Sequence, residues 1–263
     1  MTVLAVAAVA AFLAGAEPFD RFPGAAPSYL VAVDGSPIWA RAPDAPRAPA
    51  SLAKILAALV ALESTPSAEW LTVSPRAASA TGSRIGLRPG EQVRFADAVA
   101  ATLIKSANDA CLAVAESLSG SGAAFASRMN RRAAELGLAG TRFVDPCGHD
   151  APGQHTTARD LWKLARVALG NPEFRRLVAL PEVRLETRAG RVLQAATSNA
   201  LLGRLPGADG VKTGFTPEAG KCVVAHAVRD GREVLVVLLG APDRWWTAAA
   251  LVERAFTETA PLD

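Results

Sequence analysis

Residues 51–63, which read Ser-Leu-Ala-Lys-Ile-Leu-Ala-Ala-Leu-Val-Ala-Leu-Glu, decide how this chain folds. Apolar side chains recur there at the spacing of one helix face, at Leu52, Ile55, Leu56, Leu59 and Leu62. Val60 and the alanines make the other faces apolar too, which predicts a helix buried in the middle of the protein and ended by Pro66. Ser51 and Lys54 are spaced i, i+3, so this helix places both side chains on one face.

Strand patterns flank this helix in the sequence. Before it, Tyr29–Val33 and Pro37–Arg41 predict two strands joined at Asp34-Gly35. After it, three more strands are predicted, the last two joined at Asp230-Gly231: Gly210–Phe215, Cys222–Val228 and Glu233–Leu239. Helices are predicted at Phe95–Leu103, Asp109–Leu118, Phe125–Leu138, Thr157–Leu169 and Trp245–Thr257.

This order of elements predicts an α/β (α+β) fold, with an antiparallel sheet flanked by helices plus a mostly helical subdomain. The N-terminal hairpin would complete a C-terminal sheet. We therefore expect a sheet subdomain at about 25–66 and 200–263 and a helical subdomain at about 67–199. Both would belong to one domain, residues 17–263, with a cleft between the two parts.

Composition excludes several classes of protein. With 263 residues, 50% of them hydrophobic and 20% charged, the chain can bury a sizeable core and is too apolar to be disordered. The net charge of +3 comes without a run of Lys or Arg, so we expect no nucleic-acid partner. No Cys or His cluster has metal-ligand spacing, and we expect neither a metal nor another cofactor. We expect a monomer.

The cysteines and the N-terminus bear on the compartment. Cys111, Cys147 and Cys222 are odd in number, so we expect buried thiols, with room for one disulfide where the compartment is oxidising. Residues 1–16 have no charged side chain and end in Ala14-Gly15-Ala16, which is similar to an export-signal cleavage site. We expect a cleaved signal and a soluble periplasmic or extracellular protein; a buried N-terminal helix is the alternative.

Ser51 follows Pro49-Ala50 at the predicted helix N-terminus, where free backbone N–H groups favour developing negative charge. A serine hydroxyl is a poor nucleophile until a base takes its proton. Lys54 can be that base only when neutral, which requires its pKa to fall by about 3 units, or roughly 4 kcal/mol. The apolar neighbours supply desolvation, and Lys212 would add repulsion. The alternative for this pair is a capping serine and a solvated lysine.

Two further strings carry polar groups suited to the same chemistry. Ser106-Ala107-Asn108 falls between two predicted helices, where Ser and Asn commonly serve as caps. In the functional interpretation, Ser106 relays a proton to a leaving amine and the Asn108 amide binds a substrate backbone. Lys212-Thr213-Gly214 lies on a predicted strand, where Gly214 lets a ligand approach the backbone closely.

Lys212 and Thr213 offer a charge and a hydroxyl to a terminal carboxylate. The backbone N–H of Phe215, with that of Ser51, could form an oxyanion hole, whose donors are often worth about 3 kcal/mol each. A surface strand with a Thr-Gly turn is the alternative. On spacing alone, no triad with Ser51 is indicated for the three histidines, which we expect to be structural: His149, His155 and His226.

S-x-x-K, S-x-N and K-T-G in this order are typical of serine enzymes that recognise penicillin. Together with Gly86–Gly90, Phe143–Leu164 and Asp209–Gly220, they make residues 28–258 resemble the D-alanyl-D-alanine carboxypeptidases, the low-molecular-mass penicillin-binding proteins. The resemblance implies a β-lactamase/D,D-peptidase-like fold. It also implies an exported enzyme that cleaves D-Ala-D-Ala in peptidoglycan stem peptides through an acyl-enzyme on Ser51, with the pentapeptide and β-lactams as ligands.

By this resemblance the catalytic residues are Ser51, Lys54 and Ser106, and the substrate-binding residues are Asn108, Lys212, Thr213, Gly214, Phe215 and, on a looser match, Arg244. Many members of the family carry a second β-rich domain and a C-terminal membrane anchor. Because this sequence stops at Asp263, straight after the last predicted helix, we expect neither.

Three alternatives stay open. A D,D-endopeptidase of cross-links would use the same residues. A class A β-lactamase needs an additional carboxylate that activates the deacylating water. Glu173 and Glu182 lie in the right region but outside the expected E-x-x-L-N setting. A non-catalytic penicillin- or peptidoglycan-binding protein on the same fold would leave Ser51 inert.

Overall fold

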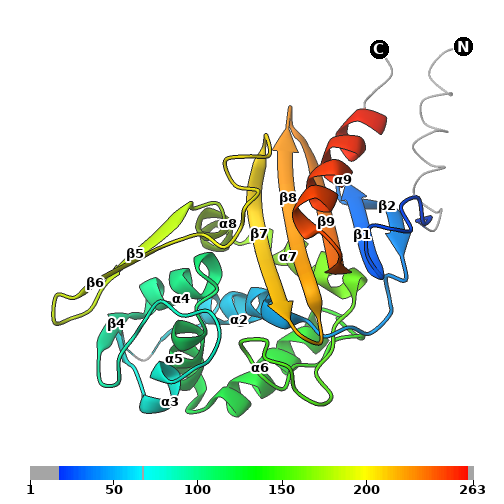
Figure 1. Cartoon of the computed structure of the whole chain (residues 1–263). Helices are drawn as coiled ribbons and strands as arrows, with labels where there is room; N and C mark the ends of the chain where they lie inside the picture. The colour runs from blue at the N-terminus through cyan, green and yellow to red at the C-terminus, as the bar shows by residue number, and fades with distance from the viewer. Residues whose placement is uncertain (1–17, 67, 260–263) are drawn as a thin grey trace, which may run out of the picture.

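The computed structural model describes residues 18–66 and 68–259, and the predicted export signal at residues 1–16 lies outside this part of the chain. Its main sheet is antiparallel and has the strand order β2-β1-β9-β8-β7 (Figure 1). The strands are β1 Ser28–Val33, β2 Ser36–Arg41, β7 Ala208–Thr216, β8 Gly220–Arg229 and β9 Arg232–Ala241. Tyr29 lies opposite Leu238, so the N-terminal hairpin completes the C-terminal sheet as predicted.

Both predicted hairpin turns have the backbone conformation that their sequences favour. Asp34 and Gly35 have φ of 48° and 76°, and Asp230 and Gly231 have φ of 50° and 77°. Two successive left-handed residues are what a tight two-residue hairpin requires, and Asp-Gly adopts them at low cost. These turns fix the register of β1 with β2 and of β8 with β9.

Helices cover both faces of the sheet. The last helix, α9 (Arg244–Glu258), packs against one face, and Figure 1 shows it in front of β8 and β9. Val31, Val223 and Val236 form a core with α9, whereas the next residues along β8 and β9, Val224 and Val237, face the opposite core. The opposite face is covered by α7 (Ala158–Gly170). Burial on both faces explains why β8 and β9 read as continuous apolar runs.

The helical part is built around α2 (Ala53–Leu62), which follows a short 3₁₀ turn at Ala50–Leu52. Every residue of α2 except Leu62 is buried, as its all-round apolar pattern predicts. It is surrounded by the remaining longer helices: α4 Phe95–Ile104, α5 Asn108–Ser119, α6 Gly122–Glu135 and α7. The helix ends at Leu62, earlier than the predicted stop at Pro66, and the Ser64 hydroxyl hydrogen-bonds to the carbonyl of Val60 in its last turn.

Several short elements were not predicted. They are α3 Pro75–Ala78, α8 Pro172–Val178 and two small two-stranded sheets, formed by β3 Trp70–Thr72 with β4 Gln92–Arg94 and by β5 Glu182–Glu186 with β6 Val192–Ala196. Asn171-Pro172 follows the end of α7 and also starts α8, because the Asn171 side chain accepts hydrogen bonds from the N–H groups of Glu173 and Phe174. In the described part of the chain, no helix combines the length and apolar character needed to cross a membrane.

Candidate active site

A cleft of about 350 Å³ lies where the edge strand β7 meets the helical part. Residues from all three predicted strings line it: Ser51, Ser106, Asn108, Thr213, Gly214, Phe215 and, from α9, Arg244. The other two predicted site residues, Lys54 and Lys212, are buried behind this surface, with 0% and 1% of their area exposed. The fold thus brings together segments that are far apart in the sequence.

The nucleophile candidate and the base candidate are in contact. Ser51 lies in the 3₁₀ turn that leads into α2, and its Oγ is 3.1 Å from Lys54 Nζ. Ala50, just before it, has a φ of 47°, a left-handed conformation that is costly for a residue with a side chain. This backbone strain lies directly beside the reactive hydroxyl.

Lys54 has a polar cage inside an apolar surrounding. Its Nζ donates hydrogen bonds to Asn108 Oδ1 at 2.6 Å and to the carbonyl of Cys147 at 2.5 Å. Burial lowers the pKa of Lys54 to about 7, partly opposed by the negative charge of Asp145. The apolar residues around Lys54 in the sequence predict this direction, and a sizeable fraction of Lys54 is therefore neutral near pH 7.

Lys212 is the second buried cation. Its Nζ donates to the carbonyl of Thr213 at 3.0 Å. Burial, then the charges of Lys54 and Arg244, hold the pKa of Lys212 well below its ordinary range. The repulsion between the two lysines that was expected to act on Lys54 thus acts on Lys212. Thr213 Oγ1 lies 3.0 Å from Ser198 Oγ, so a second hydroxyl, not predicted from the sequence, joins the cleft wall.

Two glycines allow the backbone to pack closely around Ser51. A Cβ at Gly214 would lie 3.1 Å from Ser51 N and 3.0 Å from the Cβ of Ala50. On the other side, a Cβ at Gly148 would lie 1.9 Å from the carbonyl oxygen of Ala50. The K-T-G strand and the loop around Gly148 therefore both touch the turn that carries Ser51, and each contact depends on a missing side chain.

Ser106 and Asn108 lie between α4 and α5. Ser106 has a φ of 62°, is almost fully buried and lines the cleft. The Asn108 side chain does not cap α5; its Oδ1 accepts from Lys54, and its Nδ2 donates to the carbonyl of Thr81 at 2.6 Å. The capping interpretation of this asparagine is therefore wrong. Its amide is part of the cage around Lys54.

Arg244 closes the β7 end of the cleft. Its Nη1 donates to the carbonyl of Gly214 at 2.6 Å, and its guanidinium lies 4.7 Å from the centre of the Trp245 ring. Its Nε is buried and has no hydrogen-bond partner in the described part of the protein. A buried donor without a partner is costly, and a bound anion would satisfy it.

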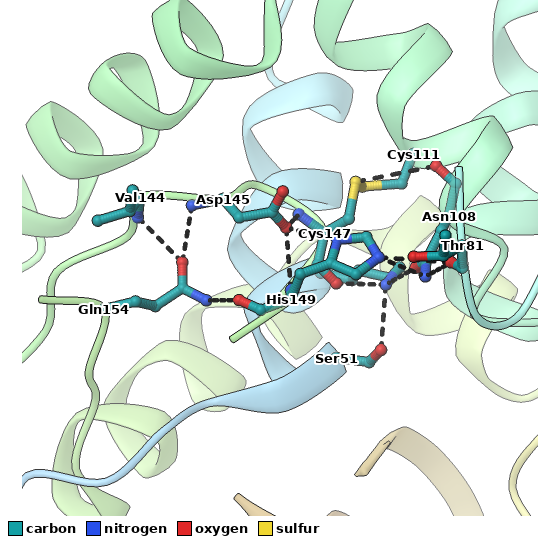
Figure 2. A network of polar contacts seen from close by, with 10 residues as sticks. Ser51, Thr81, Asn108, Cys111, Val144, Asp145, Cys147, His149 and Gln154 are labelled. Carbon is teal, nitrogen blue, oxygen red and sulfur yellow. Dashed lines mark hydrogen bonds and ion pairs between the residues drawn. A yellow bond between two sulfur atoms is a disulfide. The ribbon is translucent and has the colours of Figure 1, made fainter. Parts of the chain in front are cut away.

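Cys147, Gly148 and His149 also line the cleft, and their place in the site was not predicted from the sequence. They belong to the loop Asp145–His149, whose polar contacts are drawn in Figure 2. Cys147 supplies the carbonyl that binds Lys54, and it is joined by a disulfide to Cys111 of α5. We expected buried thiols with room for one disulfide; this pair forms it, while Cys222 is a free buried thiol whose pKa burial raises to about 11. His149 lines the cleft, although no role in the site was expected for it.

A family model described as D-alanyl-D-alanine carboxypeptidase matches residues 27–243. The chain belongs to this family. Among curated D-alanyl-D-alanine carboxypeptidases, DacF of Bacillus subtilis is 33% identical over 82% of this chain, and DacB2 of Mycobacterium tuberculosis is 33% identical over 92% of it. The chain spans 58% of the length of DacF and 86% of that of DacB2.

Solved structures from D,D-peptidases have the same fold. The D-alanyl-D-alanine carboxypeptidase of M. tuberculosis H37Rv gives a TM-score of 0.83 at 31% identity and covers 93% of this chain and 95% of its own. The Streptomyces K15 DD-transpeptidase gives a TM-score of 0.81 at 28% identity and covers 89% of this chain and 97% of its own. The predicted D,D-peptidase-like fold is confirmed.

The carboxylates that a class A β-lactamase would need lie elsewhere in this member of the carboxypeptidase family. Glu173 is exposed on α8 and pairs with Arg176 at 2.7 Å. Glu182 is exposed at the start of β5 and accepts a hydrogen bond from Gln194. Both side chains are engaged at the surface, outside the residues that line the cleft.

Proposed function

We propose that the protein is a serine-type D-Ala-D-Ala carboxypeptidase that acts on peptidoglycan stem peptides through an acyl-enzyme on Ser51 and is inhibited by penicillin. The observation that carries this proposal is the state of Lys54. It is fully buried, has a pKa of about 7 and lies 3.1 Å from the Ser51 hydroxyl. A base that titrates near the working pH is suited to activating a serine.

In the acylation step, Ser51 Oγ attacks the carbonyl between the two D-Ala residues and its proton passes to Lys54. The oxyanion of the tetrahedral intermediate would accept hydrogen bonds from the N–H groups of Ser51 and Phe215, and the position of Gly214 beside Ser51 N supports this pairing. Ser106 then relays a proton to the leaving amine, D-Ala departs, and the Ser51 ester remains. Water hydrolyses this ester and restores the free serine.

Substrate binding follows from the edge position of β7. An unpaired strand edge can accept an extended peptide as an additional strand. The free C-terminal carboxylate would then meet the hydroxyls of Thr213 and Ser198 and the Arg244 guanidinium, with Lys212 behind them. Phe215, with 61% of its area exposed, offers an apolar surface at the same end of the cleft. A β-lactam would enter by the same route and acylate Ser51.

A peptidoglycan substrate requires export, and we propose that residues 1–16 act as the signal and that residues 17–263 form one catalytic domain, active as an exported monomer. The activity test uses purified protein with diacetyl-L-Lys-D-Ala-D-Ala and measures released D-Ala by chromatography. We expect release by the native protein, none by Ser51→Ala, and native rates in Ser127→Ala, an exposed serine of α6. Cleavage of a cross-linked dimer fragment without release from this tripeptide would favour an endopeptidase and overturn the proposal.

A further inference from the structure

A chain of polar contacts runs from the loop Asp145–His149 to Asn108 (Figure 2), which in turn binds Lys54. His149 Nδ1 lies 3.2 Å from Asp145 Oδ1, and His149 Nε2 lies 3.1 Å from Asn108 Nδ2. Asn108 Oδ1 in turn accepts the 2.6 Å hydrogen bond from Lys54. The imidazole is therefore two hydrogen bonds away from the base, on the far side of Asn108.

The donors and acceptors of this chain can all be paired in one arrangement. Lys54 Nζ is a donor, so Asn108 must turn its oxygen towards it and its NH₂ group away. One hydrogen of that NH₂ goes to the carbonyl of Thr81 at 2.6 Å. The other points at His149 Nε2, which can accept it only without a proton of its own. His149 then carries its proton on Nδ1 and donates it to Asp145.

We propose that His149 and Asp145 are positioning residues of the active site: the neutral imidazole, oriented by the Asp145 carboxylate, accepts from the Asn108 amide and holds its oxygen on Lys54. This inference deepens the proposed function, on which its kinetic test rests. It assigns to the loop a purpose beyond supplying the Cys147 carbonyl.

The anchor of this arrangement is the Asp145 carboxylate. Besides the imidazole, Asp145 Oδ1 accepts the backbone N–H groups of Cys147 at 2.9 Å and His149 at 3.0 Å. Burial favours the neutral acid, but these hydrogen bonds outweigh it and hold the pKa of Asp145 below its ordinary value. The carboxylate therefore stays charged at neutral pH and fixes both the loop and the ring.

Protonation of His149 would break the arrangement. A second N–H on Nε2 would face the Asn108 NH₂, donor against donor, and would have to turn to the carbonyl of Thr81 at 3.4 Å, which also accepts from Asn108. The amide would lose a partner and Lys54 would lose a fixed acceptor. The hydrogen bond to Asp145, partly opposed by burial, raises the pKa of His149. Protonation of His149 is thereby moved towards the pH range in which Lys54 titrates.

The charged groups around the imidazole are Asp145 on its own loop and Lys54 on α2, which act on it in opposite directions. Across the cleft, the positive charges of Lys54 and of Arg244 of α9 act on Lys212 of β7. Asp150, the next residue along the chain, is directed to the backbone N–H of Glu218. Because His149 and Lys54 are coupled, their two proton losses belong to the pair.

The kinetic test compares the pH dependence of acylation by benzylpenicillin in the native protein, His149→Gln and His155→Gln. Glutamine can place an acceptor near the position of Nε2 but does not titrate. We expect the native rate to fall on the acid side with a slope approaching two protons. His149→Gln should fall with a slope of one and keep its high-pH rate within about threefold. His155→Gln, in the same loop but hydrogen-bonded to Gly153, should match the native slope. An unchanged slope in His149→Gln would overturn the inference.

A second measurement does not depend on activity. Nitrogen chemical shifts of the His149 imidazole report which ring nitrogen carries the proton. We expect the Nδ1–H form above neutral pH, with Nε2 unprotonated, and a change of that pattern in Asp145→Asn. A native protein with the proton on Nε2 would refute the inference even if acylation proceeds normally. If Ser51 is never acylated, the proposed function fails, while this measurement still decides the inference.

Discussion

Replacing Gly148 by alanine should displace the loop that holds Lys54. Gly148 has a φ of 88°, and a Cβ there would lie 1.9 Å from the oxygen and 2.5 Å from the carbon of the Ala50 carbonyl. Because Cβ atoms essentially never approach closer than 3.0 Å, the two backbones must separate by about 1 Å. No side-chain rotation can relieve this contact, since both obstructing atoms are backbone.

The size of the effect follows from what the loop carries. The carbonyl of Cys147, the residue before Gly148, binds Lys54 Nζ at 2.5 Å, and a shift of about 1 Å would break that bond. A misplacement of this size in an active site commonly costs on the order of 100-fold in rate. We therefore expect acylation by a fluorescent penicillin to slow by about 100-fold, measured as the second-order rate constant.

Gly153→Ala is the matched control. Gly153 lies in the same loop region with a φ of 81°, but a Cβ there would meet nothing within 4 Å. Both variants should lose about 1–2 kcal/mol of stability because alanine is unfavourable in a left-handed backbone conformation. Any further loss of thermal stability in the Gly148 variant, compared with the Gly153 variant, then measures the clash with Ala50. If the Gly148 variant is acylated within about threefold of the Gly153 variant, the packing argument for this loop is refuted.

Burial lowers the pKa of Lys54 to about 7, and the neutral form is the base, so the rate of acylation should rise with pH through about 7 and then level off. The Lys54→Arg variant should be acylated at least about 100-fold more slowly at every pH. A rate–pH midpoint near 10 would contradict this. Unfolded Lys54 binds its proton more tightly than the folded form, so the free energy of unfolding should rise with pH between about 7 and 10, and Lys54→Met should lessen this rise in denaturant titrations. Reducing the Cys111–Cys147 disulfide, which spans 36 residues, should lower the free energy of unfolding by about 4 kcal/mol, and equal melting temperatures with and without reductant would count against it. Arg244→Leu should raise KM about tenfold for a peptide with a free C-terminal carboxylate and leave a C-terminal amide unaffected; an equal change for both would exclude carboxylate binding.

Short-range patterns in the sequence predicted most of the fold. The i, i+3 spacing of Ser51 and Lys54 and the Asp-Gly turns are short-range signals, and the structure has each where it was predicted. The two-stranded sheet of β3 with β4 was missed because strands of three residues give too few alternations to read, whereas β5, of five residues, was missed although Val183 and Leu185 alternate with polar residues. α8 was missed because Asn171-Pro172 signals an end and a start at once.

The cage around Lys54 was only half predictable. Asn108 belongs to an ordered motif, so its place in the site could be expected even though its partner could not. His149 lies in an irregular loop and reaches the site through its contact with Asn108, 41 positions away, and Asp145 reaches it through His149. No periodicity encodes such contacts. The Cys111–Cys147 pair was open for the same reason, since three cysteines allow three pairings.

The intact mass of the protein after incubation with benzylpenicillin tests most directly whether Ser51 is a nucleophile activated by Lys54. We expect a lasting increase by the mass of one penicillin, located on Ser51 by peptide mapping and absent from Ser51→Ala. An unmodified native protein, or an adduct that persists in Ser51→Ala, would contradict it.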